Sequence, residues 1–298
     1  MEGSVVAWGW DEEGEFVVPE GLVATQIAAG IQWFALAIRS DGSVVAWGYN
    51  NYGQCNVPAG LVAKQVSAGS GHALAIRSDG SVVAWGDNYY GQCNVPAGLV
   101  ATQVAAGDAH SLAIHSDGSV VAWGYNYYRQ CNVPAGLVAT QVAAGMACSF
   151  ALCPDGSVVA WGYNGYGQCD VPAGLVATQV AAGQGHSLAI CPDGSVVAWG
   201  MNYFGECDVP AGLVATQVAA GQGHSLAICP DGSIIAWGRN EELQCDVPEI
   251  PEGMIAKQVS AGQWYSLALV GPKGEEVDPR RRRRRAAWLN LEKPKTLF

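Results

Sequence analysis

Ten cysteines and five histidines are the residues of this 298-residue chain that could hold a metal ion or act as a nucleophile. Six of the cysteines recur at one position of a repeated pattern, and Phe16 takes that position once. Phenylalanine cannot ligate a metal, and the chain has no Cys-x-x-Cys pair. We therefore expect thiols packed among apolar neighbours rather than a metal site. The six are Cys55, Cys93, Cys131, Cys169, Cys207 and Cys245.

Four histidines also share one position, which we align with Trp33, Cys148 and Tyr265 in the other repeats. A catalytic or metal-binding ring would not tolerate these substitutes, so we expect a hydrogen-bonded structural role near the start of a strand. Cys153, Cys191 and Cys229 lie at hairpin ends, where we expect free thiols and hence a reducing compartment. The four histidines are His72, His110, His186 and His224.

The remaining candidates for catalysis have simpler interpretations. Each recurring Asp-Gly pair supplies one acid per turn, whereas a calcium loop needs several spaced oxygen ligands. No phosphate-binding loop, Gly-x-Ser-x-Gly elbow or His-Glu-x-x-His helix occurs. We predict no catalytic residue, no metal and no cofactor, and so a protein that is not an enzyme. The acids are Asp41, Asp79, Asp117, Asp155, Asp193 and Asp231.

These residues belong to a repeat marked by tryptophan. The phrase Val-Val-Ala-Trp-Gly, as at 82–86, is typical of a strand, and 101–105 and 111–114 fit two more short strands. Asp117-Gly118 indicates a hairpin, and Pro58 places Cys-Asn-Val-Pro on an outer edge strand, because proline cannot donate to a ladder. We expect four strands per repeat. The markers are Trp8, Trp47, Trp85, Trp123, Trp161, Trp199 and Trp237.

Seven such repeats predict an all-β, seven-bladed β-propeller. The chain starts within the phrase at Gly3-Ser4-Val5, and the last repeat stops after 266–270. We therefore predict closure by pairing of the N- and C-terminal strands, which removes the exposed edges of an open array. The expected domains are a propeller over 1–270 and a short basic, flexible tail over 271–298.

Residues 181–200 resemble the regulator of chromosome condensation repeat, and the resemblance extends from residue 3 to about 270. It implies a seven-bladed propeller. The best-known member is an exchange factor for a nuclear small GTPase, and a plant relative is an ultraviolet-B photoreceptor. This chain lacks the inserted wedge of the first and the Gly-Trp-Arg-His-Thr motif of the second, although Trp33 and Trp264 are partial echoes.

The variable turn after each Trp-Gly is the candidate interaction rim. It is rich in tyrosine and asparagine, and aromatic residues are favoured at interfaces because they bury large areas at low entropic cost. A protein-binding rim, ordinary surface turns and a carbohydrate-binding face are the three interpretations. The rim residues are Trp10, Tyr49, Tyr52, Tyr89, Tyr90, Tyr125, Tyr127, Tyr128, Tyr163, Tyr166, Tyr203 and Phe204.

Charge divides the chain in two. Residues 1–270 carry six Lys/Arg against 22 Asp/Glu, a net −16, whereas 271–298 carry nine against four, a net +5. An acidic body repels nucleic acid, so we expect contact with nucleic acid or an acidic surface only through the tail. Nuclear import, docking onto the propeller and a disordered extension are the other interpretations. The candidate tail contacts are Arg280, Arg281, Arg282, Arg283, Arg284, Arg285 and Trp288.

No apolar stretch has the roughly 20 residues that a transmembrane helix needs. We expect an intracellular protein of the cytoplasm or nucleus. Our leading hypothesis is a non-enzymatic protein–protein interaction scaffold, a subunit of a larger complex, with protein partners. The alternatives are a guanine-nucleotide exchange factor for a small GTPase and a multivalent lectin-like binder.

Overall fold

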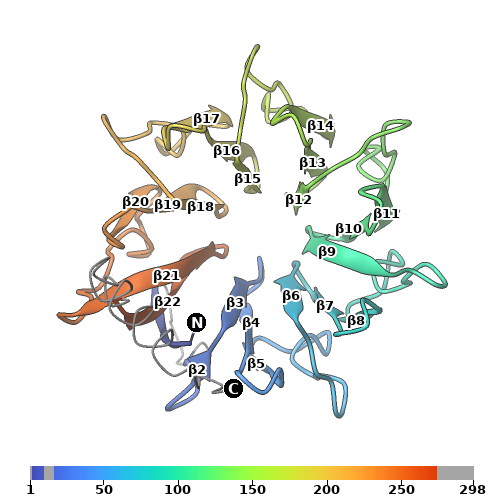
Figure 1. The fold of residues 1–298 in the computed structure, drawn as a ribbon, viewed down its shortest axis with the longest axis horizontal. Coiled ribbons are helices and arrows are strands. Elements are labelled where there is room, and N and C mark those ends of the chain that lie inside the picture. The colour runs from blue at the N-terminus through green and yellow to red at the C-terminus, as the bar shows by residue number, and fades with distance from the viewer. Residues whose placement is uncertain (1, 10–16, 274–298) are drawn as a thin grey trace, which may run out of the picture.

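The computed structural model describes residues 2–9 and 17–273. Within them, short strands form seven antiparallel sheets, which radiate from a central axis as the blades of a propeller (Figure 1). The predicted all-β, seven-bladed fold is confirmed. In this part of the chain no helix is long and apolar enough to cross a membrane.

The innermost strand of each blade is short and rich in alanine, because the blades converge on the axis and leave little room for side chains (Figure 1). These strands are β3 (Gln26–Ala29), β6 (Gln65–Ala68), β9 (Ala101–Ala106), β12 (Gln141–Ala144), β15 (Gln179–Ala182), β18 (Gln217–Ala220) and β21 (Met254–Ala261).

The middle strands form the most buried layer. Every residue of β7, for example, is buried, because sheets cover it from both neighbouring blades. The middle strands are β4 (Phe34–Ile38), β7 (His72–Ile76), β10 (His110–His115), β13 (Cys148–Leu152), β16 (His186–Ile190), β19 (His224–Ile228) and β22 (Tyr265–Pro272).

The third strand of each blade carries the repeated tryptophan. Its β-branched residues suit a half-buried pleated surface. These strands are β1 (Gly3–Gly9), β5 (Val44–Gly48), β8 (Val82–Gly86), β11 (Val120–Gly124), β14 (Val158–Gly162), β17 (Val196–Gly200) and β20 (Ile234–Gly238). The hydrophobic core consists of seven clusters that lie between adjacent blades.

The two ends of the propeller meet in one blade. Strand β1 pairs with β22 in antiparallel register, from Ser4 opposite Val270 to Gly9 opposite Tyr265. The N-terminal strand therefore supplies the third strand of a blade whose other two strands come from the end of the chain. The predicted closure is confirmed.

The expectation of four strands in every repeat is wrong. Among the described residues, six sheets have three strands, and the closing sheet has a fourth, the two-residue β2 (Val23–Ala24). Four other blades have a single isolated bridge at this place, as between Ser43 and Val62. The Cys-Asn-Val-Pro segment forms a turn instead of an edge strand. Asn50 explains this difference, because its Oδ1 accepts from the Cys55 N–H at 2.8 Å and its Nδ2 donates to Asn56 Oδ1 at 3.0 Å. The side chain thus binds the Cys55 N–H, a group that a ladder would have used, and its second bond holds the turn closed.

Glutamine side chains tie each inner strand to the next blade. Gln141 Nε2 donates to Val180 O at 3.0 Å, and Val180 N donates to Gln141 Oε1 at 3.0 Å. The ring closes where Gln258 makes the same pair of bonds with Ile27, at 2.8 and 2.9 Å. The glutamines of this ring are Gln26, Gln65, Gln103, Gln141, Gln179, Gln217 and Gln258.

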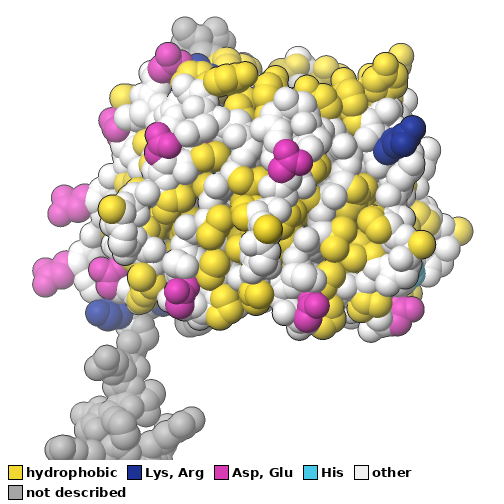
Figure 2. All heavy atoms as spheres, turned by 90° about the horizontal axis from the view of Figure 1, so that it is seen from above, with side chains coloured by type: hydrophobic (Ala, Val, Ile, Leu, Met, Phe, Trp, Pro, Cys, Tyr) yellow, Lys and Arg dark blue, Asp and Glu magenta, His cyan; other side chains and the backbone are white. Residues whose placement is uncertain are grey.

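Two faces of the propeller result from this strand order. The hairpin face carries the Asp-Gly turns, in which Ser43 N donates to Asp41 Oδ1 at 2.9 Å and Gly42 adopts φ +81°. A positive φ favours glycine, so the predicted turn role is confirmed. The loop face lies at the other end of each blade and consists of 49–57, 87–95, 125–133, 163–171, 201–209 and 239–247, with the short connections between inner and middle strands. In the side view of Figure 2, hydrophobic side chains project along the upper face.

Candidate functional site

The turns of the loop face are held from below by buried glutamine. Gln54 is fully buried, and its Oε1 accepts from the Tyr52 N–H at 3.0 Å. Its backbone carbonyl accepts from Trp85 Nε1 of the next blade at 2.8 Å. The repeated tryptophan therefore fixes the turn that presents the neighbouring blade's tyrosine. This arrangement makes the loop face rigid at its base.

The histidines contribute to the same support. His110 Nε2 lies 3.0 Å from Ser149 Oγ of the next blade, and Ser149 Oγ donates to Gln130 O at 2.8 Å. Burial lowers the pKa of His110 to about 3, so its ring is neutral at pH 7. The hydrogen bond at the strand start agrees with the structural interpretation. The alignment with Trp33 is wrong, because Phe34 pairs with Gly48 as His72 pairs with Gly86.

The cysteines behave as structural thiols. All ten are free, and the six at the shared position are half-buried. Cys93 Sγ donates to the Asp87 carbonyl at 3.1 Å. Burial raises the pKa of Cys93 to about 12, so the thiol stays protonated and is a poor nucleophile. Among the described residues, no group of three or more His, Cys, Asp or Glu could hold a metal ion.

The structure brings eight of the predicted rim residues together on the loop face. We call this set the tyrosine arc: Tyr89, Tyr90, Tyr125, Tyr127, Tyr128, Tyr163, Tyr166 and Tyr203. Rings from successive blades are in contact: the centroids are 4.6 Å apart for Tyr90 and Tyr125 and 4.8 Å apart for Tyr128 and Tyr163. The arc spans the loops of four successive blades.

Much of this aromatic surface is open to solvent. Tyr89, Tyr127 and Tyr203 are 83%, 77% and 76% exposed, whereas Tyr125 and Tyr163 are half-buried beneath them. Tilted and edge-on packing between neighbours limits the freedom of the rings before any partner arrives. Rings that are exposed and already ordered bury area at little entropic cost.

The other rim residues that the structure describes are not linked to the arc by the ring contacts above. Tyr49 and Tyr52 form a separate pair, with centroids 6.2 Å apart, and Phe204 lies under the Arg239 guanidinium at 5.3 Å. Trp10 falls outside the described residues, as do the seven candidate tail contacts, Arg280–Arg285 and Trp288.

Two tryptophans on the loop face were given no role in the sequence analysis. Trp33 and Trp264 lie on neighbouring blades with ring centroids 5.4 Å apart, and Arg239 stands 5.2 Å from the Trp264 ring. The equivalent positions include Gly71 and Gly223, where nearby rim side chains fill the space that a Cβ would occupy. The signal was present in the sequence, because tryptophan replaces glycine or alanine at this position in two repeats.

A pair of carboxylates interrupts the aromatic surface. Asp87 stands where three other blades have tyrosine, and its Oδ1 accepts from the Tyr89 N–H at 3.0 Å while its Oδ2 accepts from Gln92 Nε2 at 3.0 Å. Asp108 lies near it on the next blade, hydrogen-bonded to Ser70. Burial raises the pKa of Asp108, and the Asp87 charge adds to that effect.

At the loop face, the channel along the propeller axis offers little space for a ligand. Its hollow there has a volume of about 90 Å³ and is lined mainly by alanine and glycine from all the blades, with Ile31, Gln184 and Gln222. The contact area of this face therefore lies on the loops rather than in the channel.

The repeat geometry agrees with a comparison against known families. The model of the regulator of chromosome condensation (RCC1) repeat matches residues 24–54, 63–92, 101–130, 139–168, 177–206 and 215–244. These segments cover more than half of the chain. The chain belongs to the regulator of chromosome condensation repeat family.

Solved structures with this fold are distant in sequence. Prp20p from Saccharomyces cerevisiae is 19% identical, with a TM-score of 0.78 over 95% of this chain and 94% of that one. Human WBSCR16 is 18% identical, with a TM-score of 0.73 over 91% and 99%. At these identities the similarity establishes a shared RCC1-type propeller fold. No curated protein sequence matches the chain.

Proposed function

We propose that this RCC1-repeat propeller is a non-enzymatic interaction scaffold whose loop face binds a protein partner through the tyrosine arc. The observation that carries the proposal is the continuous chain of ring contacts from Tyr89 to Tyr203, exposed along one face. Interfaces depend on a few large aromatic anchors set on a rigid base. The buried glutamines and tryptophans supply that base.

A triple substitution of the most exposed rings tests the proposal. Tyr89→Ser, Tyr127→Ser and Tyr203→Ser remove aromatic area from turns that do not depend on it for folding. A photo-crosslinking amino acid at Tyr166 in the full chain should capture one defined partner from native extract. We expect the triple variant to lose at least about tenfold of this capture, since aromatic anchors contribute more than 1 kcal/mol each.

The matched control changes exposed apolar residues at the other end of the blades. Val100→Thr, Val138→Thr and Val176→Thr remove apolar surface from residues that are 46–49% exposed. Capture should stay within about twofold of the unmodified chain, because these changes leave the aromatic anchors in place. Equal loss in both variants, with unchanged thermal unfolding, would exclude the tyrosine arc as the binding surface.

An exchange factor for a small GTPase is the second candidate. The observation that favours it is the likeness to Prp20p, whose structure was reported with its binding properties to Gsp1p and histones. Accelerated release of a fluorescent guanine nucleotide from a purified small GTPase would establish this activity. Unchanged release across a panel of such GTPases would leave the scaffold as the function.

Carbohydrate binding is disfavoured by how the polar side chains are used. In Asn88 and Asn126, both the nitrogen and the oxygen of the side-chain amide form hydrogen bonds within the residue's own turn. On the hairpin face, a polar hollow of about 660 Å³ includes Gln141 and Gln179, whose amides bind the backbone of the next blade. Few free amides therefore face a sugar.

A further inference from the structure

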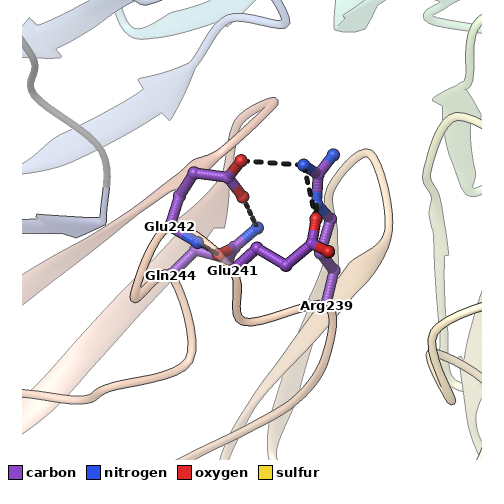
Figure 3. A network of polar contacts seen from close by, with 4 residues as sticks. All are labelled: Arg239, Glu241, Glu242 and Gln244. Carbon is purple, nitrogen blue, oxygen red and sulfur yellow. Dashed lines mark hydrogen bonds and ion pairs between the residues drawn. The ribbon is translucent and has the colours of Figure 1, made fainter.

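Arg239 shows how the loop face holds a guanidinium. Its side chain lies 5.3 Å from the Phe204 ring and 5.2 Å from the Trp264 ring. Its Nη2 is 2.8 Å from Glu241 Oε2 and 2.7 Å from Glu242 Oε1, and the dashed lines in Figure 3 mark the contacts of Arg239 with these carboxylates. Two aromatic rings and two carboxylates therefore surround one arginine.

The seam between the loops 87–95 and 125–133 also combines two aromatic rings with two carboxylates, although a tyrosine takes the place of the arginine. Tyr90 and Tyr125 lie with ring centroids 4.6 Å apart, and they occupy the positions of Phe204 and Arg239 in the repeat. Asp87 belongs to the same turn as Tyr90 and donates its N–H to Gly71 O at 2.7 Å, and Ser70 N donates to Asp108 O at 3.3 Å, so both acids lie beside the connection 70–71. Among the described residues, every ion pair and cation–π contact belongs to Arg239.

The net charge of the loop face agrees with a cationic ligand. Its described loops carry two arginines, Arg129 and Arg239, and the latter is already paired. Complementary charge steers association and selects among partners. The exposed or half-buried carboxylates of these loops are Asp87, Asp108, Asp170, Asp208, Glu241, Glu242 and Asp246.

We propose that the seam formed by Asp87, Asp108, Tyr90 and Tyr125 binds an arginine side chain on a segment of the protein partner. The carboxylates would pair with the guanidinium, and the rings would cover its face. This proposal rests on the proposed function, since it assigns a partner chemistry to the same face. Lysine is a weaker ligand, because its ammonium lacks the planar fork that stacks on rings and pairs with two oxygens.

Titration calorimetry on the full chain, with three short peptides, tests the proposal. The peptides are acetyl-Gly-Arg-Gly-Arg-Gly-amide and its lysine and citrulline forms; citrulline keeps the shape of arginine without its charge. We expect the arginine peptide to bind at least about tenfold more tightly than the citrulline peptide, with lysine between them. Equal affinity for arginine and citrulline would overturn the proposal.

Substitutions locate the site. Asp108→Asn should lower the affinity for the arginine peptide at least about fivefold. Asp193→Asn, which removes the same charge on the hairpin face, should change that affinity less than about twofold. Tyr125→Phe keeps the ring and should bind normally, while Tyr125→Leu should not. Equal weakening by Asp108→Asn and Asp193→Asn would show general attraction to an acidic body and would refute the site.

The two proposals fail in different ways. If crosslinked capture depends on the tyrosine arc but no variant of the seam affects arginine binding, the arginine site is wrong and the interaction surface stands. If capture also survives the triple tyrosine substitution, the proposed function itself is wrong.

Discussion

At the scale of single residues, the buried histidines make the stability of the propeller sensitive to acid. Burial lowers the pKa from the ordinary histidine value of 6.5 to about 4 for His72 and His186, and to about 3 for His110 and His224. The unfolded chain therefore binds protons first as the pH falls. Stability that is fully present above pH 6.5 should decline as the pH falls, down to about pH 4 for His72 and His186 and to about pH 3 for His110 and His224.

The size of this effect can be measured residue by residue. Each histidine should remove about 1.4 kcal/mol per pH unit once the pH is well below 6.5. The slope of the unfolding free energy against pH should be smaller in His110→Gln by about 1.4 kcal/mol per pH unit, which corresponds to one proton. Urea unfolding between pH 7 and 4.5 gives that slope. An unchanged slope in His110→Gln would show that this histidine is already protonated in the folded protein.

Carboxylates titrate in a different interval and serve as the internal control. The Ser43 hydrogen bonds lower the pKa of Asp41 from its ordinary value of 3.8, so the charge of Asp41 is lost only at pH values below the measured range of 7 to 4.5. Asp41→Asn should therefore leave the slope between pH 7 and 4.5 unchanged.

At the scale of strands and blades, the glutamine ring is the feature that joins one sheet to the next. Gln141→Ala would leave both the N–H and the C=O of Val180, a residue only 2% exposed, without their present partner. Orphaned buried backbone groups are costly, and we expect a loss of about 2–4 kcal/mol in the free energy of unfolding by urea.

Two further variants separate the parts of this bond pair. Gln141→Glu keeps the acceptor for Val180 N but loses the donor to Val180 O. Its free energy of unfolding should therefore lie between those of the unmodified chain and the alanine variant. Thr140→Ala removes a single bond from an exposed side chain to Leu152 O and should cost less than about 1 kcal/mol. If Gln141→Ala lowers the free energy of unfolding no more than Thr140→Ala does, the glutamine ring does not hold the blades together.

Blade number and closure were predictable because the tryptophan spacing and the split repeat are properties of the sequence itself. The glutamine ring was not predicted. In a single repeat, a glutamine on a short strand resembles a solvent-facing residue, because its hydrogen-bond partners lie on the next blade. The outer strand was wrongly predicted because Asn50 competes for backbone groups that propensity assigns to a ladder. The tyrosines were identified, but their linkage into an arc depends on blade-to-blade distances that no single repeat encodes.

At the scale of the whole molecule, ring closure depends on one strand from the start of the chain. Val5 packs in one core cluster with Leu267 and Leu269, and Trp8 Nε1 donates to Gln244 O at 2.9 Å. Without β1, the β22 edge would be exposed, and exposed edges pair with other chains. Closure therefore protects against association as well as stabilising the fold.

Deleting residues 1–9 should open the ring. We expect the midpoint of thermal unfolding to fall by about 10 °C or more, since the loss of one strand and its core contacts amounts to several kcal/mol in a chain of this size. Light scattering of the shortened chain should show larger oligomers than the full chain forms. Addition of a synthetic peptide of residues 1–9 should restore the oligomeric state of the full chain. Deleting 274–298 instead leaves both closing strands intact and should change neither measurement. A shortened chain that keeps the midpoint and the assembly state of the full chain would contradict closure by β1, because the other blades would then be stable as an open array.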